Sequence, residues 1–133
     1  MKEINIKIKE RKDIVGIEQM LNNINKDFKL DEIKFVNLVI AVTEALINAI
    51  VHGNKNNPDK NVNILIRYDE KCLIIKIIDE GEGFILDTVP DPTEQENIFK
   101  ENGRGLFIMK SLVDNFEFIS DKNGTTIILK MYK

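Results

Sequence analysis

The sequence predicts a single two-layer α+β domain in which helices pack on a mostly antiparallel sheet. Three observations support this fold class. Strand-like segments come in two pairs, each joined by a turn of hairpin length. The helix-like segments are grouped between strands instead of alternating with them, and the 133 residues contain no internal repeat and no linker. We therefore expect the order β-α-α-β-β-loop-α-β-β, with one domain spanning residues 1–133.

Periodicity and capping residues indicate the first strand and the two helices that follow it. Isoleucines alternate with polar residues in EINIKIKE, residues 3–10, as in a half-buried strand. Asp13 is placed to cap a helix whose apolar residues recur at every third or fourth position. Asp31 is placed to cap a second, longer helix, which Gly53 ends.

Two hairpins make up the rest of the predicted sheet. VNILIRY and CLIIKIID, residues 62–68 and 72–79, are strands separated by three residues. FEFIS and TTIILKM, residues 116–120 and 125–131, flank the turn sequence DKNG. A third helix is expected between the hairpins, from about Arg104 to Asp114.

Composition excludes several classes of protein. The chain is 43% hydrophobic and 31% charged, as soluble globular domains are. Its net charge of −3 and its scattered Lys and Arg argue against binding to a nucleic-acid backbone. The single cysteine, Cys72, excludes an internal disulfide framework, and no apolar run has the length of a membrane span or the form of a signal peptide. We therefore expect a cytoplasmic protein that binds neither nucleic acid nor membrane.

The second predicted helix carries an unusual seam of polar residues. Between residues 36 and 52 the only charged side chain is Glu44. On a helical wheel five small or polar residues fall within about 80° of one another; they are Asn37, Ala41, Glu44, Asn48 and His52. A helix that is apolar almost all round is typically buried, and burying a carboxylate is costly unless it is paired, hydrated or bound. Two interpretations remain open: the seam faces solvent, or it lines a cavity that holds a polar ligand.

Two glycine pairs favour the cavity. IIDEGEGF places Asp79 at the end of a strand, followed by Gly81 and Gly83, and NGRGLFIMKSL places Gly103 and Gly105 at the start of a helix. Glycine lets the backbone approach a ligand closely, and a helix N-terminus attracts phosphate. Neither pair matches the Walker pattern or the dinucleotide fingerprint.

Four motifs therefore follow one another: E-x-x-x-N, D-x-G-x-G, G-x-G-L and G-T-T. In this order and over almost the whole chain, the sequence resembles the GHKL ATPases, a superfamily of gyrase, heat-shock chaperone, histidine kinase and mismatch-repair types. Within it, the sequence is most similar to the small bacterial anti-sigma-factor serine/threonine kinases. The resemblance implies the histidine-kinase-like ATPase (Bergerat) fold, with a mixed, mostly antiparallel sheet covered on one face by three main helices.

The resemblance also implies roles for the first two motifs. Asn48 corresponds to the asparagine that coordinates the Mg²⁺ bridging the phosphates of ATP, and an amide oxygen suits that hard cation. Glu44 corresponds to the general base that takes a proton from the attacking hydroxyl. Asp79 corresponds to the aspartate that accepts a hydrogen bond from the adenine amino group, and Gly81 and Gly83 leave room for the base.

The remaining motifs are expected to surround the phosphates and the adenine. Gly103, Arg104, Gly105 and Leu106 correspond to the second glycine box, whose backbone amides meet the phosphates. Arg104 either reaches the γ-phosphate or is a solvated surface residue. Residues 85–102, with their two prolines, correspond to the mobile ATP lid.

The roles of two further positions remain open. His52 either approaches the phosphates or interacts with the dipole at the helix C-terminus. The threonine near the adenine pocket is either Thr125 or Thr126.

The implied function is that of an ATP- and Mg²⁺-dependent protein serine/threonine kinase acting as an anti-sigma factor. Its substrate would be a serine of a STAS-type antagonist, its second partner a sigma factor, and a homodimer remains open. The alternative is a nucleotide-dependent module that sequesters a partner without phosphotransfer; Glu44 favours the kinase, because binding alone needs no carboxylate there. A sensor histidine kinase is disfavoured because His52 is the only histidine. A gyrase- or chaperone-type ATPase is disfavoured because those proteins need further domains.

Overall fold

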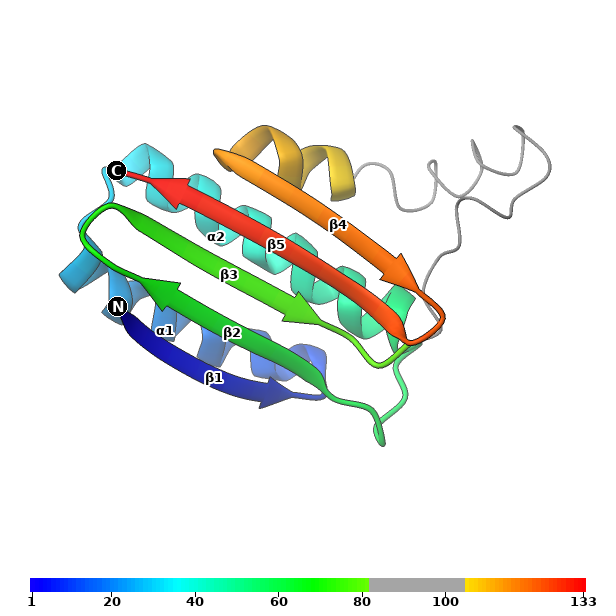
Figure 1. The fold of residues 1–133 in the computed structure, drawn as a ribbon. Helices are drawn as coiled ribbons and strands as arrows, with labels where there is room; N and C mark the ends of the chain where they lie inside the picture. Colours follow the sequence, from blue (N-terminus) through cyan, green and yellow to red (C-terminus); the bar gives the residue numbers. More distant parts are fainter. Residues whose placement is uncertain (82–104) are drawn as a thin grey trace.

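The computed structural model of the chain describes residues 1–81 and 105–133. Its sheet has five strands in the order β1-β2-β3-β5-β4 (Figure 1). In that order they are β1 (Lys2–Ile8), β2 (Val62–Tyr68), β3 (Cys72–Ile78), β5 (Gly124–Tyr132) and β4 (Asn115–Asp121). All four pairings of neighbours are antiparallel. The α+β fold class is thus confirmed, and where a mixed sheet was expected, the described strands contain no parallel pair.

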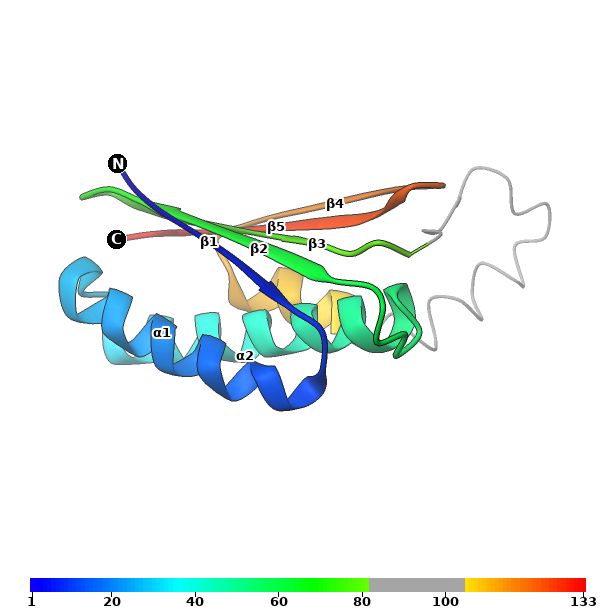
Figure 2. The same cartoon turned by 90° about the horizontal axis from the view of Figure 1, so that it is seen from below.

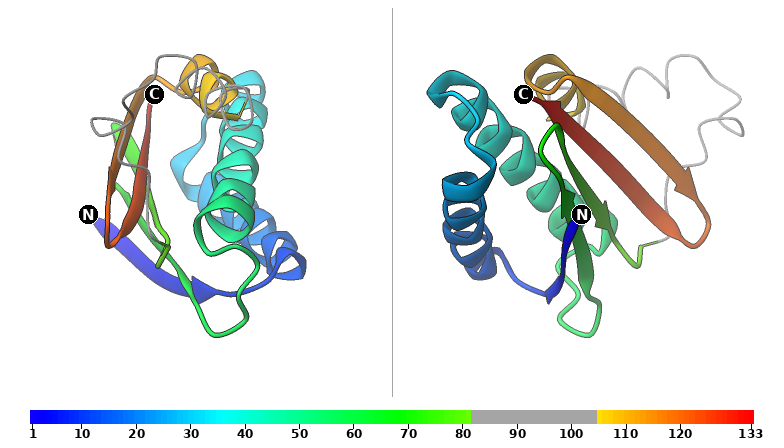
Figure 3. Two further views of the ribbon diagram at one scale, coloured as in Figure 1. Left: turned by 90° about the vertical axis from the view of Figure 1, so that its right-hand side faces the viewer. Right: turned by 60° about the vertical axis from the view of Figure 1, so that its left-hand side comes forward.

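All described helices lie on one face of this sheet, so the molecule has two layers (Figure 2). A short 3₁₀ turn, η1 (Arg11–Asp13), leads into α1 (Ile14–Phe28). α2 (Glu32–Ile47) continues without a break into the π-helical turn η2 (Asn48–Gly53). A further helix spans residues 105–112. The three main helices expected on one face are therefore present, with α2 as the middle one (Figure 3).

One of the two expected helix caps is present. Asp31 has extended backbone angles, and its Oδ1 accepts a hydrogen bond from the N–H of Lys34 at 2.9 Å, which satisfies one free donor of the first turn of α2. The expectation for Asp13 was wrong. Asp13 has helical backbone angles and its carboxylate accepts from the N–H groups of Lys9 and Glu10, so it fixes the preceding turn and does not cap α1.

The core lies between the sheet and the helices. Alternate residues of the strands face the helices, such as Ile64 and Ile66 of β2 and Ile75 and Ile77 of β3, and all four are at most 1% exposed. The apolar stripe predicted for α1 is buried against them.

The expectation that α2 is buried almost all round was wrong. Its inner side is buried, but three of its apolar residues, Ile33, Val36 and Ile40, are 74%, 50% and 42% exposed. Within the described residues, Glu32–Gly53 is the one helix long and apolar enough to cross a membrane by length and composition, where no segment of that length was expected. A core helix of a soluble protein passes the same test, and 44% of its most apolar window is buried here. α2 thus has an apolar side in the core and a second one outside it.

Candidate functional site

Asp79 lies at the centre of the candidate site, just past the end of β3. It continues the alternation of buried residues along that strand, so its side chain is directed toward the helical layer, as those of Ile75 and Ile77 are. Only 3% of Asp79 is exposed. Burial raises the pKa of its carboxyl group, and hydrogen bonds from the backbone N–H groups of Thr125 and Gly81 oppose that rise.

The two carboxylate oxygens of Asp79 have different surroundings. Oδ1 accepts hydrogen bonds from the N–H of Gly81 at 3.0 Å and from the N–H of Thr125 at 2.9 Å. Oδ2 lies against Gly53, where an added Cβ would come within 2.0 Å of it. No donor within residues 1–81 or 105–133 reaches Oδ2. Oδ1 therefore fixes the side chain, and Oδ2 is left as an acceptor for a ligand.

Glycines allow three chain segments to meet around Asp79. A Cβ added at Gly81 would lie 2.1 Å from the carbonyl oxygen of Gly53. Gly124 has a φ of 135°, and a Cβ there would lie 2.5 Å from the carbonyl oxygen of Asp79. Only glycine fits these distances and this backbone angle. The end of η2, the turn after β3 and the start of β5 are thus in contact through backbone.

The structure separates the two candidate threonines. Thr125 is 2% exposed and belongs to the set of β5 residues that face the helices, and its backbone carbonyl accepts from the N–H of Asp79 at 3.0 Å. The hydroxyl groups of Thr125 and Ser120 are 2.9 Å apart and hydrogen-bonded. Thr126 is paired with Ile78 and faces the other side of the sheet. Thr125 is therefore the threonine that adjoins Asp79.

Asn54, which no sequence motif includes, holds the turn after Asp79 in place. Asn54 is 3% exposed; its Nδ2 donates to the carbonyl of Asn61 at 3.0 Å, and its Oδ1 accepts from the N–H of Glu80 at 2.8 Å. One amide thus links the end of η2 to the entrance of β2 and to the residue after Asp79. The segment HGNKNNPDKN contains several asparagines in a polar loop, so nothing in the sequence distinguishes Asn54 from its neighbours.

The E-x-x-x-N motif lies on the same helical run that ends at Gly53. Glu44 is half-buried on α2, and a Cβ added at Gly105 would lie 3.4 Å from its Oε2, so the helix over residues 105–112 starts beside this carboxylate. The N–H of Asn48 donates to the backbone carbonyls of Glu44 and Ala45, and Asn48 is 7% exposed. Asn48 also begins the π-helical turn, a local geometry that is common at functional sites.

The structure therefore groups the described motif residues into two neighbouring sets. Asp79, Gly81 and Thr125 form one set, and Glu44 and Gly105 form the other. The run from Glu44 through Asn48 to Gly53 connects them. His52 is exposed on η2 and Leu106 is half-buried. Gly83, Gly103, Arg104 and residues 85–102 lie outside the described residues.

The metal-ligating side chains of the site suit an ion that is bound mainly by the phosphates of a ligand better than an ion bound by protein alone. Within residues 1–81 and 105–133, no three His, Cys, Asp or Glu side chains are grouped so that they could hold a metal ion. Mg²⁺ binds through few protein oxygens when phosphates supply the others. The single amide of Asn48 fits that mode of binding.

Comparison with known proteins decides the family. The sequence model of the histidine kinase-like ATPase domain matches residues 9–131. The chain belongs to this family. As a member of a family of ATPase domains, it uses ATP.

Two curated proteins illustrate what the chain is similar to. The anti-sigma F factor of Bacillus cytotoxicus is 39% identical over 109 residues, which cover 78% of this chain and 70% of that protein. The serine-protein kinase RsbW of Oceanobacillus iheyensis is 27% identical, covering 97% of this chain and 85% of that protein.

Solved structures agree with the family's fold. The RsbU and RsbW domains of a Mycobacterium tuberculosis protein match with a TM-score of 0.70 at 16% identity, covering 98% of this chain and 32% of that longer chain. A histidine kinase domain of Erythrobacter litoralis matches with a TM-score of 0.58 at 16% identity, covering 91% of this chain and 59% of that one. At these identities the matches bear on the fold alone, and they support the histidine-kinase-like ATPase fold expected from the motifs.

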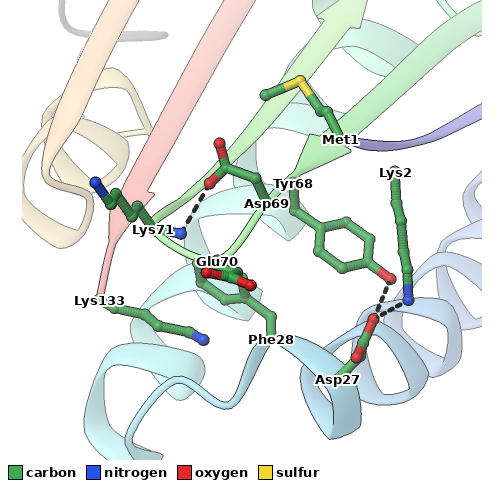
Figure 4. A pocket seen from close by; sticks show the side chains of 9 residues that line it. All are labelled: Met1, Lys2, Asp27, Phe28, Tyr68, Asp69, Glu70, Lys71 and Lys133. Carbon is green, nitrogen blue, oxygen red and sulfur yellow. Dashed lines mark hydrogen bonds and ion pairs between the residues drawn. The ribbon is translucent and has the colours of Figure 1, made fainter.

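This ATPase domain also has a polar pocket of about 630 Å³ beside the turn from β2 to β3, at the end of β3 opposite to Asp79 (Figure 4). Here the Asp27 carboxylate accepts from the Tyr68 hydroxyl at 3.0 Å and forms an ion pair with Lys2. The hydrogen bond from Lys2 lowers the pKa of Asp27, and burial raises that of Tyr68. The charged groups that line the pocket are exposed, and none belongs to the four motifs.

Proposed function

We propose that the chain is an ATP-dependent protein serine/threonine kinase that acts as an anti-sigma regulatory factor in the cytoplasm. Its substrate is a serine of a STAS-type antagonist, and its second partner is a sigma factor. The observation that carries this proposal is the position of Glu44 beside Gly105, because nucleotide binding alone requires no carboxylate where the phosphates are expected. The two relatives, named anti-sigma F factor and serine-protein kinase RsbW, support the same activity.

Each residue of the site has a separate task in the proposed reaction. Asp79 holds the adenine through Oδ2, which accepts from its amino group, while Thr125 and Gly81 fix Oδ1. Asn48 would supply an amide oxygen to Mg²⁺, and the ion would neutralise charge on the phosphates. Backbone N–H groups at the start of the helix over residues 105–112 face the phosphate groups.

Glu44 acts on the acceptor. Its carboxylate takes the proton of the serine hydroxyl as the hydroxyl oxygen attacks the γ-phosphorus in line. The bond from the γ-phosphorus to the bridging oxygen breaks, ADP leaves, and the serine carries the phosphoryl group. The proton remains on Glu44 until solvent removes it.

Phosphotransfer from γ-labelled ATP to a STAS-domain protein of the same organism tests the proposal. Glu44→Gln keeps the shape of the side chain but cannot take a proton, so transfer should fall by about 10²–10⁴-fold, while ATP affinity should stay within a few-fold. Glu32→Gln is the matched control, because Glu32 is an exposed carboxylate at the other end of α2. Binding of ATP without any transfer by the parent protein would instead indicate a nucleotide-dependent module that sequesters its partner. Full transfer by Glu44→Gln would show that Glu44 is not the base.

A further inference from the structure

The outward side of α2 carries a row of exposed apolar residues, which we call the α2 ridge: Ile33, Val36 and Ile40. They are 74%, 50% and 42% exposed. Their spacing of three and four places them on one side of the helix. A helix that covers a sheet normally turns charged and polar residues to solvent, so this apolar side requires an explanation other than the core.

The remaining sides of α2 are already occupied. The inner side is buried in the core. On one flank the hydroxyl of Thr43 donates to the carboxylate of Glu18 of α1 at 3.2 Å. On another, Nζ of Lys34 pairs with the carboxylate of Asp114 at 3.2 Å and donates to the carbonyl of Tyr132 at 2.8 Å. The α2 ridge is thus the side that faces away from the sheet. Figure 3 shows α2 as the middle helix of the layer.

The ridge leads directly to Glu44. Ile40 lies one helical turn before Glu44, and Glu44 is itself half-buried beside Gly105. Among the described residues, the core and the sheet close off the inner side of α2, so the outer side of the helical layer is the side from which a protein substrate can approach Glu44. Between residues 33 and 43 the only charged side chain is Lys34, which is engaged with Asp114. A patch without unpaired charge is typical of the centre of a protein interface.

We propose that the α2 ridge is the docking surface for the protein whose serine hydroxyl Glu44 deprotonates, and that this protein covers the ridge with an apolar surface next to that serine. This inference rests on the proposed kinase function. A partner that is merely sequestered has no need to touch Glu44, whereas the acceptor must, and the ridge ends at that residue. The acceptor is therefore the occupant that the position of the ridge favours.

Two substitutions on the ridge test the inference without disturbing the core. Val36→Ser and Ile40→Ser each remove apolar surface from an exposed position. With a STAS-domain protein of the same organism as the acceptor, each should raise the KM for the acceptor about tenfold, as the loss of a residue central to an interface does. The kcat at saturating acceptor and the affinity for ATP should not change. Ile119→Ser is the control, since Ile119 is 55% exposed on β4 and faces away from the helices.

The outcomes separate this inference from the proposed function. An unchanged KM for the acceptor in both ridge variants would overturn the proposal that the α2 ridge is the docking surface, and would leave the proposed kinase function unaffected. Calorimetric titration of the acceptor needs no phosphotransfer: if the parent protein transfers nothing but both ridge variants still weaken binding, the kinase function fails and the docking surface stands. If Val36→Ser and Ile40→Ser instead convert a dimer into a monomer in sedimentation, the ridge is a contact between copies of this chain, and the inference is wrong.

Discussion

Replacing Gly53 by alanine should damage both stability and nucleotide binding, although alanine favours helices more than glycine does. An ideal Cβ at position 53 would lie 2.0 Å from Oδ2 of Asp79 and 2.5 Å from its Cγ. Unstrained contacts between heavy atoms lie at about 3.5–4.0 Å. Either the carboxylate or the π-helical turn η2 must therefore move by more than an ångström.

The size of the effect follows from what each response would cost. Moving the carboxylate gives up the two backbone hydrogen bonds to Oδ1, each worth about 1.5–3 kcal/mol because the acceptor is charged. Moving η2 instead is a case of overpacking, which costs about 1–3 kcal/mol. The protein adopts the cheaper response, and alanine recovers at most about 1 kcal/mol of helix propensity. We expect the free energy of unfolding to fall by about 1–3 kcal/mol.

Gly16→Ala provides a matched control. Gly16 is also helical, on α1, but an added Cβ there meets nothing within 4 Å. This substitution should raise the free energy of unfolding by up to about 1 kcal/mol. Urea unfolding measures both variants, and titration calorimetry should show a loss of ATP affinity of at least tenfold for Gly53→Ala alone. If Gly53→Ala matches the parent in stability and in ATP affinity, Asp79 does not lie against η2 and the adenine site is wrongly placed.

Three further substitutions probe the same site. Asp79→Asn should weaken ATP binding by about 10- to 100-fold in calorimetry, because a donor replaces the acceptor Oδ2. Burial raises the pKa of Asp79, so the folded protein loses stability as pH rises through the range between the ordinary and the raised pKa. Asp79→Asn should therefore gain stability relative to the parent over that range. A difference in the free energy of unfolding between the two proteins that does not change with pH would contradict this. Asn48→Asp should change the Mg²⁺ dependence of ATP binding, and an identical Mg²⁺ titration would remove Asn48 from the metal site. Asn54→Ala should lower the free energy of unfolding by about 1–3 kcal/mol, because it removes both hydrogen bonds of the buried Asn54 amide, and unchanged stability would show that these bonds do not stabilise the turn after Asp79.

Features of the fold that depend on local pattern were predictable from the sequence. The alternation along β3 continues through Asp79, so the same period that predicts the strand also places the carboxylate on the buried face. The cap at Asp31 was predictable because only the residues next to it decide its geometry. Asp13 differs because its carboxylate has two backbone donors in the preceding turn, and these compete with the helix for the same oxygen.

Contacts between distant segments were not predictable. Asn54 is buried because η2, β2 and the turn after Asp79 converge on it, and no local pattern encodes that convergence. Gly53 ends the helical run as predicted, but its close contact with Asp79, 26 residues later in the chain, was not predictable. The choice between Thr125 and Thr126 required the register of β5 against β3, which places Thr126 opposite Ile78.

The surroundings of Asp79 explain how an acidic group in the core can serve ligand selection. Oδ1 and Oδ2 share one charge, but only Oδ1 is compensated by N–H donors among the described residues. The fold therefore bears part of the cost of desolvating the carboxylate, as the raised pKa indicates. A ligand that donates to Oδ2 recovers that cost, whereas one that presents a carbonyl there sets acceptor against acceptor. In the adenine site that we propose, the amino group of adenine would meet this condition and the carbonyl of guanine would not, so we expect ATP to bind more tightly than GTP.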